Sequence, residues 1–245
     1  MVAWSKGSPA IETNKLDGVP RPPGEDGVPY EDACVMRTIG AQLQVYKIPL
    51  DPTPLDTPHY FVDESTDYVV RGCVGMSKDG VPLYPYFDNV LRTAWDSCES
   101  DLCNAHAGKG EDYHYHGDPF GDTCAYGSAD YTGTHPPQMG WGMDGYPVYG
   151  RHISNSEYND GITVDLDDCQ GHEHDAYGYH YHGTQVEIVD GSNEWTEWRI
   201  GPSVCWKGDI TLIENFWETE NDQVHYDRSM TANGGYWPML DDDAE

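Results

Sequence analysis

The chain has 245 residues, of which 43 are Asp or Glu and 13 are Lys or Arg, so its formal net charge is −30. A field of that sign repels phosphate backbones and anionic lipid, which argues against nucleic acid and membrane surfaces as partners. Phe is scarce, whereas 27 Gly, 17 Pro, 18 Tyr and 8 Trp favour short strands and tight turns. We therefore predict a mostly β, loop-rich fold.

The chain divides into an arm, a domain and a tail. Residues 1–33 are rich in Pro, Gly and charge without a helical or strand period, so we expect an acidic arm that either wraps the core or lies free. Runs of β-branched and aromatic residues at 41–50 and 67–73 predict strands, and the Pro-rich cluster 51–58 between them predicts a turn. The domain is expected to span residues 34–235, followed by a solvated acidic tail at 236–245.

Hydropathy and cysteine content bear on location. No stretch approaches the roughly 20 apolar residues that span a bilayer, and the first residues lack the apolar core of a secretory signal, as expected for a mature or trimmed form. Seven cysteines point to an oxidising compartment. We expect a secreted, periplasmic or cell-surface protein without membrane insertion.

Two segments, 79–117 and 144–183, repeat one pattern. Each begins with Asp-Gly-x-Pro-x-Tyr, and each continues with Cys-x2-His-x7-His-x-His-Gly, which starts at Cys103 in the first copy and Cys169 in the second. Chance does not plausibly produce identical spacing, so we infer a duplicated unit whose copies are related by an approximate twofold axis.

Both copies end in Tyr-His-Tyr-His-Gly, at 113–117 and 179–183. In an extended strand the side chains alternate between faces, which puts the two histidines on one side about 7 Å apart at their bases. A third histidine, eight residues upstream, can return across a turn. Because neutral imidazole suits zinc and copper, these triads predict a metal site. The predicted ligands are His106, His114, His116, His172, His180 and His182.

Several alternatives stay open at this point. The histidines can instead form a structural lattice with the tyrosines, or act as acids and bases without metal. One triad per ion leaves an open fourth position, whereas pooling the triads across the twofold axis gives a closed or dinuclear site. Calcium is an alternative ion, given the number of acids. Outside the pattern, His174 either adds a ligand or faces solvent, and no role is assigned to His59, His135, His152 and His225.

The aspartates of the repeat also allow two interpretations. Asp79 and Asp144 open Asp-Gly-x-Pro-x-Tyr, which predicts first of all a tight turn that leads into a strand. The functional alternative makes both of them oxygen ligands or acceptors that orient an imidazole N–H. Asp101 and Asp167, two residues before each cysteine of the repeat, are further candidates of this kind.

The cysteines are either thiolate ligands or disulfide partners. Cys-x2-His at Cys103 and Cys169 is a recognised half of a zinc site. In an oxidising compartment we favour disulfides that hold the histidine strands in place. The predicted pairs are Cys103–Cys124, Cys169–Cys205 and Cys34–Cys73, and Cys98 is the odd cysteine without a predicted partner.

These motifs together resemble the YHYH protein family. The resemblance rests on DGVPLY and DGYPVYG, on LDDCQGH ahead of GYHYHGT, and on PSVCWKG, and it covers about residues 70–208. The first copy departs from the family pattern, because DLCNAH replaces a more glycine-rich form. The resemblance implies an extracytoplasmic domain of unassigned biochemical role.

Three functions are compatible with these features. The first is an extracytoplasmic protein that holds zinc or copper for structure, sequestration or delivery. The second is a metal-dependent hydrolase or oxidase with an open coordination position in a cleft, where Asp144 or a tyrosine acts as acid, base or redox partner. The third is a matrix or surface protein whose exposed Tyr and Trp meet glycans or other chains.

Overall fold

The computed structural model describes residues 2–5, 37–40, 42, 44–63, 68–70, 72–88, 91–94, 100–108, 111–132, 135–151, 166–190 and 193–210. The regular structure in this part is almost entirely β, as predicted, with turns and loops between the strands and one 3-10 helix, η1 (Ser128–Asp130). The strands are β1 (Val2–Ser5), β2 (Gln44–Lys47), β3 (Pro54–Tyr60), β4 (Val62–Asp63), β5 (Tyr68–Val69), β6 (Gly75–Ser77), β7 (Pro82–Leu83), β8 (Ala105–Ala107), β9 (Tyr113–Tyr115), β10 (Gln138–Gly142), β11 (Pro147–Tyr149), β12 (Gly171–His174), β13 (Gly178–Asp190), β14 (Asn193–Ile200) and β15 (Cys205–Gly208). The expected boundaries near residues 33 and 236 lie outside the described residues.

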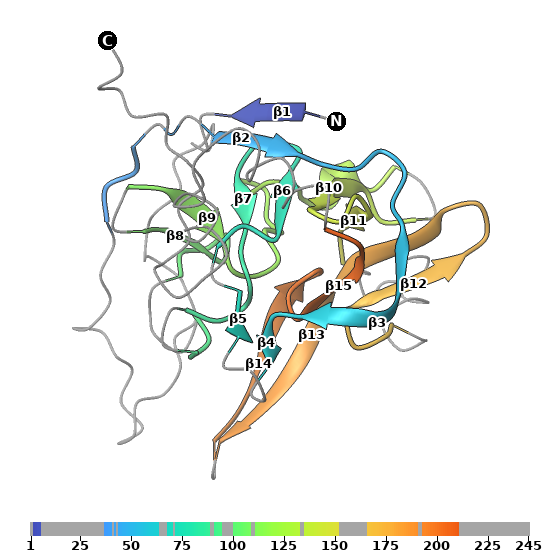
Figure 1. Cartoon of the computed structure of the whole chain (residues 1–245). Helices are drawn as coiled ribbons and strands as arrows, with labels where there is room; N and C mark the ends of the chain where they lie inside the picture. Colours follow the sequence, from blue (N-terminus) through green and yellow to red (C-terminus); the bar gives the residue numbers. More distant parts are fainter. Residues whose placement is uncertain are drawn as a thin grey trace.

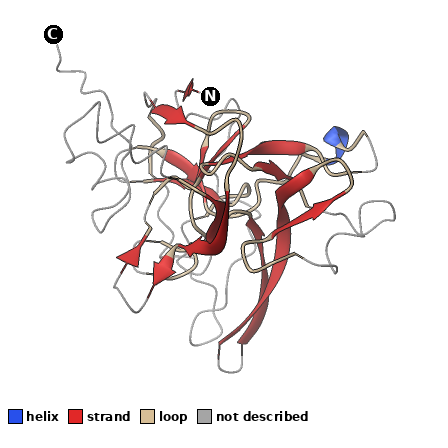
Figure 2. Cartoon of the chain, turned by 45° about the vertical axis from the view of Figure 1, so that its right-hand side comes forward, coloured by secondary structure: helices blue, strands red, loops and turns tan. Residues whose placement is uncertain are grey.

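One nine-stranded sheet organises the described part of the chain (Figure 1). Its strand order is β12-β13-β11-β10-β6-β7-β9-β8, and β14 pairs with β13 to form a long hairpin, which is prominent in Figure 2. The sheet curls into a half-barrel, with β8 and β9 on one side of the view in Figure 1 and β12 on the other. The pairs β1–β2, β3–β15 and β4–β5 form separate two-stranded sheets.

The two halves of the large sheet have matching strand pairings. In the middle β6 and β10 pair antiparallel, and each forms an antiparallel pair with the next strand in the chain, β7 or β11. That strand then runs parallel to a histidine strand, β9 or β13. Each histidine strand pairs antiparallel with the strand that precedes it, β8 or β12. The histidine strands therefore occupy corresponding places in the two halves.

The Asp-Gly motif forms the tight turn that the sequence predicts. Gly80 and Gly145 have φ of +84° and +94°, a region that glycine enters without steric penalty. The amide of Gly80 donates to the carbonyl of Ser77, and that of Gly145 to the carbonyl of Gly142, both at 3.0 Å. Each turn directs the chain into β7 or β11, beside a histidine strand.

Two stretches differ from expectation. The cluster at 51–58, predicted as a turn, contributes to β3, which pairs with β15. Prolines are tolerated in such an edge strand because one side of it needs no ladder hydrogen bonds. Residues 2–5, expected as part of a featureless arm, form β1 and pair with β2. Four residues are too few to give a periodic signal in the sequence.

Aromatic rings fill much of the core. Trp206 is fully buried, its indole N–H donates to the carbonyl of Val74 at 2.9 Å, and its ring meets that of Phe61 edge-on at 4.6 Å. Buried tyrosines add bulk, but each hydroxyl needs a hydrogen-bond partner. The fully buried ones are Tyr46, Tyr113, Tyr115, Tyr126 and Tyr181.

Candidate metal centres

The tyrosines of the first YHYH strand anchor it from one face. Tyr113 and Tyr115 are buried in β9, and their hydroxyls donate to carboxylate oxygens of Asp101 at 2.6 Å and of Asp79 at 2.9 Å. The alternation of strand side chains sends the histidines to the opposite face, as predicted. Burial and the nearby Asp79 raise the pKa of Tyr115 far above its ordinary value, so this hydroxyl stays a donor.

The first cluster consists of His106, His114 and His116, all buried. His106 lies in β8 directly opposite His114. Their Nε2 atoms form a nearly equilateral triangle, with separations of 3.0 Å for His106–His114, 3.1 Å for His114–His116 and 3.2 Å for His116–His106. Tyr84 stacks on the ring of His114 at a centroid distance of 3.9 Å. The sequence prediction of this triad therefore matches the geometry.

Backbone hydrogen bonds fix the tautomers of two of these rings. Nδ1 of His114 lies 2.9 Å from the carbonyl oxygen of Asp112, and Nδ1 of His116 lies 2.6 Å from that of Pro85. A carbonyl only accepts, so each Nδ1 carries the proton, and each Nε2 of a neutral ring presents a lone pair. Burial, with the neighbouring His106 and His114, lowers the pKa of His116 well below its ordinary value, so that ring stays neutral.

The spacing of the three nitrogens fits a transition-metal ion. A zinc ion bound to imidazoles at about 2.0–2.1 Å with near-tetrahedral angles places its ligand nitrogens about 3.3 Å apart. The observed separations of 3.0–3.2 Å are close to that value. Ligating histidines also commonly donate their second ring N–H to a carbonyl or carboxylate, as His114 and His116 do here.

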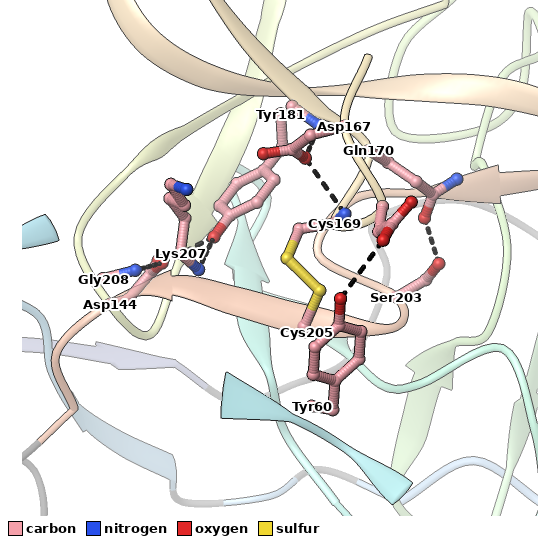
Figure 3. Close-up of a disulfide and its surroundings, with 12 residues drawn as sticks. Tyr60, Asp144, Asp167, Cys169, Gln170, Tyr181, Ser203, Cys205, Lys207 and Gly208 are labelled. Carbon is pink, nitrogen blue, oxygen red and sulfur yellow. Dashed lines mark hydrogen bonds between the residues drawn. A yellow bond between two sulfur atoms is a disulfide. The ribbon is translucent and has the colours of Figure 1, made fainter. Parts of the chain in front are cut away.

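The second YHYH strand is anchored in the same way. The hydroxyl of Tyr181 donates to the buried Asp144 at 2.5 Å, and that of Tyr179 donates to Asp167 at 3.0 Å. Figure 3 shows Tyr181 directed at Asp144 beside the backbone of β15, where the amide of Gly208 donates to the same carboxylate at 2.9 Å.

The second cluster contains two of the three predicted ligands, His180 and His182, together with two other histidines. The histidines whose candidate ligand nitrogens lie within 4.8 Å of one another are His135, His174, His180 and His182. His172 lies beside this group, with its ring centroid 4.8 Å from that of His180 and 5.0 Å from that of His182. Those distances resemble the 4.7–4.8 Å between ring centroids in the first cluster.

The ring nitrogens of the second cluster are oriented by backbone carbonyls too. Nδ1 of His135, His180 and His182 lies 2.9, 2.7 and 2.9 Å from the carbonyl oxygens of Pro136, Gly178 and Gly150, respectively. Nε2 of His135 and Nε2 of His180 face each other at 3.2 Å, again without a proton between two neutral rings. Burial lowers the pKa of His180 to about 4.

Sequence reasoning missed His135, which has no counterpart in the first copy and carries no motif. His174 joins the cluster, which favours the ligand interpretation of that residue. Asp79 and Asp144 bind tyrosine hydroxyls on the face opposite the histidines, and neither belongs to a histidine cluster. The turn interpretation of these aspartates matches the structure, and their predicted place beside the imidazoles does not. His152 and His225 lie outside the described residues.

Two predicted disulfides are present. Cys103–Cys124 and Cys169–Cys205 close loops of 21 and 36 residues, so the alternative that Cys103 and Cys169 are thiolate ligands is wrong. Figure 3 shows how the second bridge ties the chain before β12 to β15. Cys73 is buried, and its predicted partner Cys34 lies outside the described residues, as does Cys98.

A family model described as YHYH protein matches residues 45–163. The chain carries a YHYH domain. The resemblance expected from the motifs is confirmed, although the match begins earlier than residue 70 and ends before the second Tyr-His-Tyr-His. It includes the whole first cluster and His135. No curated protein and no solved structure matches the chain.

Among the residues that the structure describes, no helix is long and apolar enough to cross a bilayer.

Proposed function

We propose that this chain is an extracytoplasmic metal-binding protein and that each histidine cluster of its YHYH domain holds a divalent transition-metal ion, zinc or copper. The observation that carries the proposal is the triangle of Nε2 atoms in the first cluster. Those of His114 and His116 lie 3.1 Å apart while both Nδ1 protons are donated to backbone carbonyls. Two lone pairs facing each other at that distance repel, and a shared cation removes the repulsion.

The same observation weighs against a structural lattice of histidines and tyrosines. In such a lattice each ring donor faces an acceptor, because an unsatisfied buried polar atom costs about 1–3 kcal/mol. The tyrosine hydroxyls obey this rule through their aspartates, on the opposite face of the strands. The facing Nε2 atoms of His114 and His116 break it.

The donor chemistry favours zinc or copper over calcium. Both clusters offer imidazole nitrogens, which suit zinc and copper, whereas calcium takes six to eight oxygen ligands. The four aspartates of the repeat accept hydrogen bonds from tyrosine hydroxyls on the other face of the strands. We therefore assign calcium no place in either cluster.

The extracytoplasmic location in this proposal is supported by the two disulfides. Bridges of this kind persist in oxidising compartments and are rare in the cytosol.

The number of ligands in the first cluster favours a second candidate function, a metal-dependent enzyme. Three protein ligands with one further position are typical of catalytic zinc centres, and zinc or copper would supply Lewis acidity or redox chemistry there. The chain's own contribution would be to hold three imidazoles in a buried setting. Addition of azide to the cobalt-loaded protein separates the two functions, because a change in the visible spectrum requires an open position.

Metal content is the direct test. We expect protein purified without a nickel column and titrated with zinc to bind about two equivalents, because there are two clusters. His114→Ala should lower this to about one equivalent, because it removes one of only three ligands. His59→Gln, outside both clusters, is the control and should keep both. Binding of less than about one equivalent of zinc, copper, cobalt or nickel by the unaltered protein would refute the proposal.

We also infer that the two copies of the repeat are related by an approximate twofold axis between β6 and β10. The inference is supported by the antiparallel pairing of these strands and by the order of the strands on either side of them. Separate clusters, one per copy, favour one ion per cluster over a pooled site.

A further inference from the structure

The two histidine clusters differ in the number of rings they contain. The first has three, His106, His114 and His116. In the second, the ring of His180 is surrounded by four others, whose centroids lie 4.8–5.1 Å away. These four are His135, His172, His174 and His182. Four of these five rings, those of His135, His174, His180 and His182, bring candidate ligand nitrogens within 4.8 Å of one another, so the cluster offers one ligand more than the first.

The additional rings of the second cluster have no equivalents in the first copy. His174 follows His172 by two residues, and the residue two after His106 is Gly108. A side chain there would meet the carboxylate of Asp112, because a Cβ on Gly108 would lie 2.5 Å from its Oδ1. His135 precedes Asp144 by nine residues, and the residue nine before Asp79 is the buried Val70. The first cluster therefore gains no further imidazole from these two positions.

The clusters also differ in their access to solvent. The three rings of the first are at most 6% exposed, whereas the side chain of His174 is 34% exposed. Tyr177, itself 43% exposed, stacks on the ring of His135 at a centroid distance of 4.1 Å and an interplanar angle of 18°. It covers that ring on the side of the solvent.

A carboxylate flanks the exposed side of the second cluster. Asp175 is exposed and follows His174 in sequence, and its Oδ2 lies 3.1 Å from Nδ1 of His174. Exposed negative charge beside a ligand group raises the local concentration of cations and speeds their association.

We propose that the second cluster is an exchange site, which takes up and releases its ion, while the first cluster retains its own. This inference rests on the metal-binding function proposed above. With a fourth imidazole present, the ion can give up one ligand to a chelator and still be bound by three, so it never has to lose several bonds at once. The first cluster lacks this reserve among its three ligands, and its burial keeps chelators away.

A chelator chase tests the difference in release. The full chain is loaded with about two equivalents of cobalt, excess EDTA is added, and the visible absorbance is followed with time. We expect two phases of equal amplitude, with the second at least about tenfold slower than the first. The double variant His180→Ala with His182→Ala, which leaves two imidazoles in the second cluster, should remove the fast phase, and His116→Ala should remove the slow one. A single rate for both equivalents, or the reverse assignment of the phases, would overturn the proposal.

Stoichiometry tests the surplus ligands independently. His174→Ala should still bind two equivalents, because three imidazoles of its cluster remain, whereas His106→Ala should bind one, because only two remain in the first cluster. Circular dichroism checks that both variants are folded. If His174→Ala does not fold, Tyr177→Ala provides a second test, because it should accelerate the fast phase alone. Loss of an equivalent in folded His174→Ala, or an unchanged fast phase in Tyr177→Ala, would contradict the exchange site. If the unaltered protein binds no metal at all, the metal-binding function itself fails.

Discussion

Nε of Arg151 donates to the carboxylate of Asp118 and so joins the two copies of the repeat. Asp118 directly follows the first YHYHG and is fully buried, and Arg151 follows the glycine whose carbonyl accepts from His182. The guanidinium lies 3.8 Å from the ring centroid of Trp198 and 4.6 Å from that of Phe120. This pair connects the segment that follows β9 to the segment that follows β11.

Replacement of Arg151 should strongly destabilise the protein. Arg151→Met leaves Asp118 buried without its counter-charge, and breaking a buried ion pair in this way costs about 3–5 kcal/mol. Burial already raises the pKa of Asp118, and Arg151 opposes that rise. Urea unfolding measures the loss. The double variant with Asp118→Asn should recover much of it, and a loss below about 1 kcal/mol in the single variant would contradict the prediction.

Metal should stabilise the folded protein. An ion that binds only the native state adds about 2.7 kcal/mol at a free concentration one hundred times its Kd. Zinc should therefore raise the thermal midpoint, and EDTA should reverse the change. The variant that combines His114→Ala with His180→Ala and His182→Ala leaves two imidazoles in each cluster and should respond far less. An equal rise in that variant would place the binding elsewhere.

The stability of the metal-free protein should carry a pH dependence from Asp144. Burial raises the pKa of this carboxyl from 3.8 to about 6, against the opposing effect of the hydrogen bond from Tyr181. The unfolded chain loses this proton at a lower pH than the folded protein. The stabilisation that the protonated Asp144 gives the folded protein is therefore complete below pH 3.8 and is lost as the pH rises through about 6.

Asp144→Asn removes this titration and serves as the comparison. When the pH falls from about 7 to about 4.5, the unaltered protein should gain stability relative to the variant, seen as a higher urea midpoint relative to that of the variant. Parallel pH profiles of the two proteins would show that Asp144 does not titrate as described.

Both disulfides should contribute to stability. Loops of 21 and 36 residues correspond to about 3–4 kcal/mol each in the chain-entropy model, slightly more for the longer loop. Cys103→Ser with Cys124→Ser, and separately Cys169→Ser with Cys205→Ser, should lower the free energy of unfolding by that order in urea. Unchanged midpoints in both pairs would mean that neither bridge constrains the unfolded chain.

Local patterns in the sequence predicted several parts of the candidate site. Alternation along Tyr-His-Tyr-His placed the histidines on one face, and the spacing of Cys103 and Cys169 to the next cysteines gave the two disulfides. The Asp-Gly turns followed from the dihedral freedom of Gly80 and Gly145. Each of these features depends on residues close together in the chain or on a repeated pattern.

Other parts had no local signal. His135 reaches His180 across 45 residues of sequence, and nothing in its own segment marks it as a partner. Asp79 and Asp144 accept hydrogen bonds from tyrosines 36 and 37 residues away. Both carboxylates therefore lie on the tyrosine face of the histidine strands, opposite the imidazoles, and no local pattern in the sequence indicates that face.

The amino-acid sequence alone determined the β-rich character, the two histidine strands and the first triad, because strand periodicity and hydrogen-bonded turns are local properties of the backbone. Only the tertiary structure decided that the second cluster contains His135 and His174 and that Arg151 joins the two copies. Those contacts depend on how the sheet curls, which brings together segments whose separation along the chain carries no information about their distance in space.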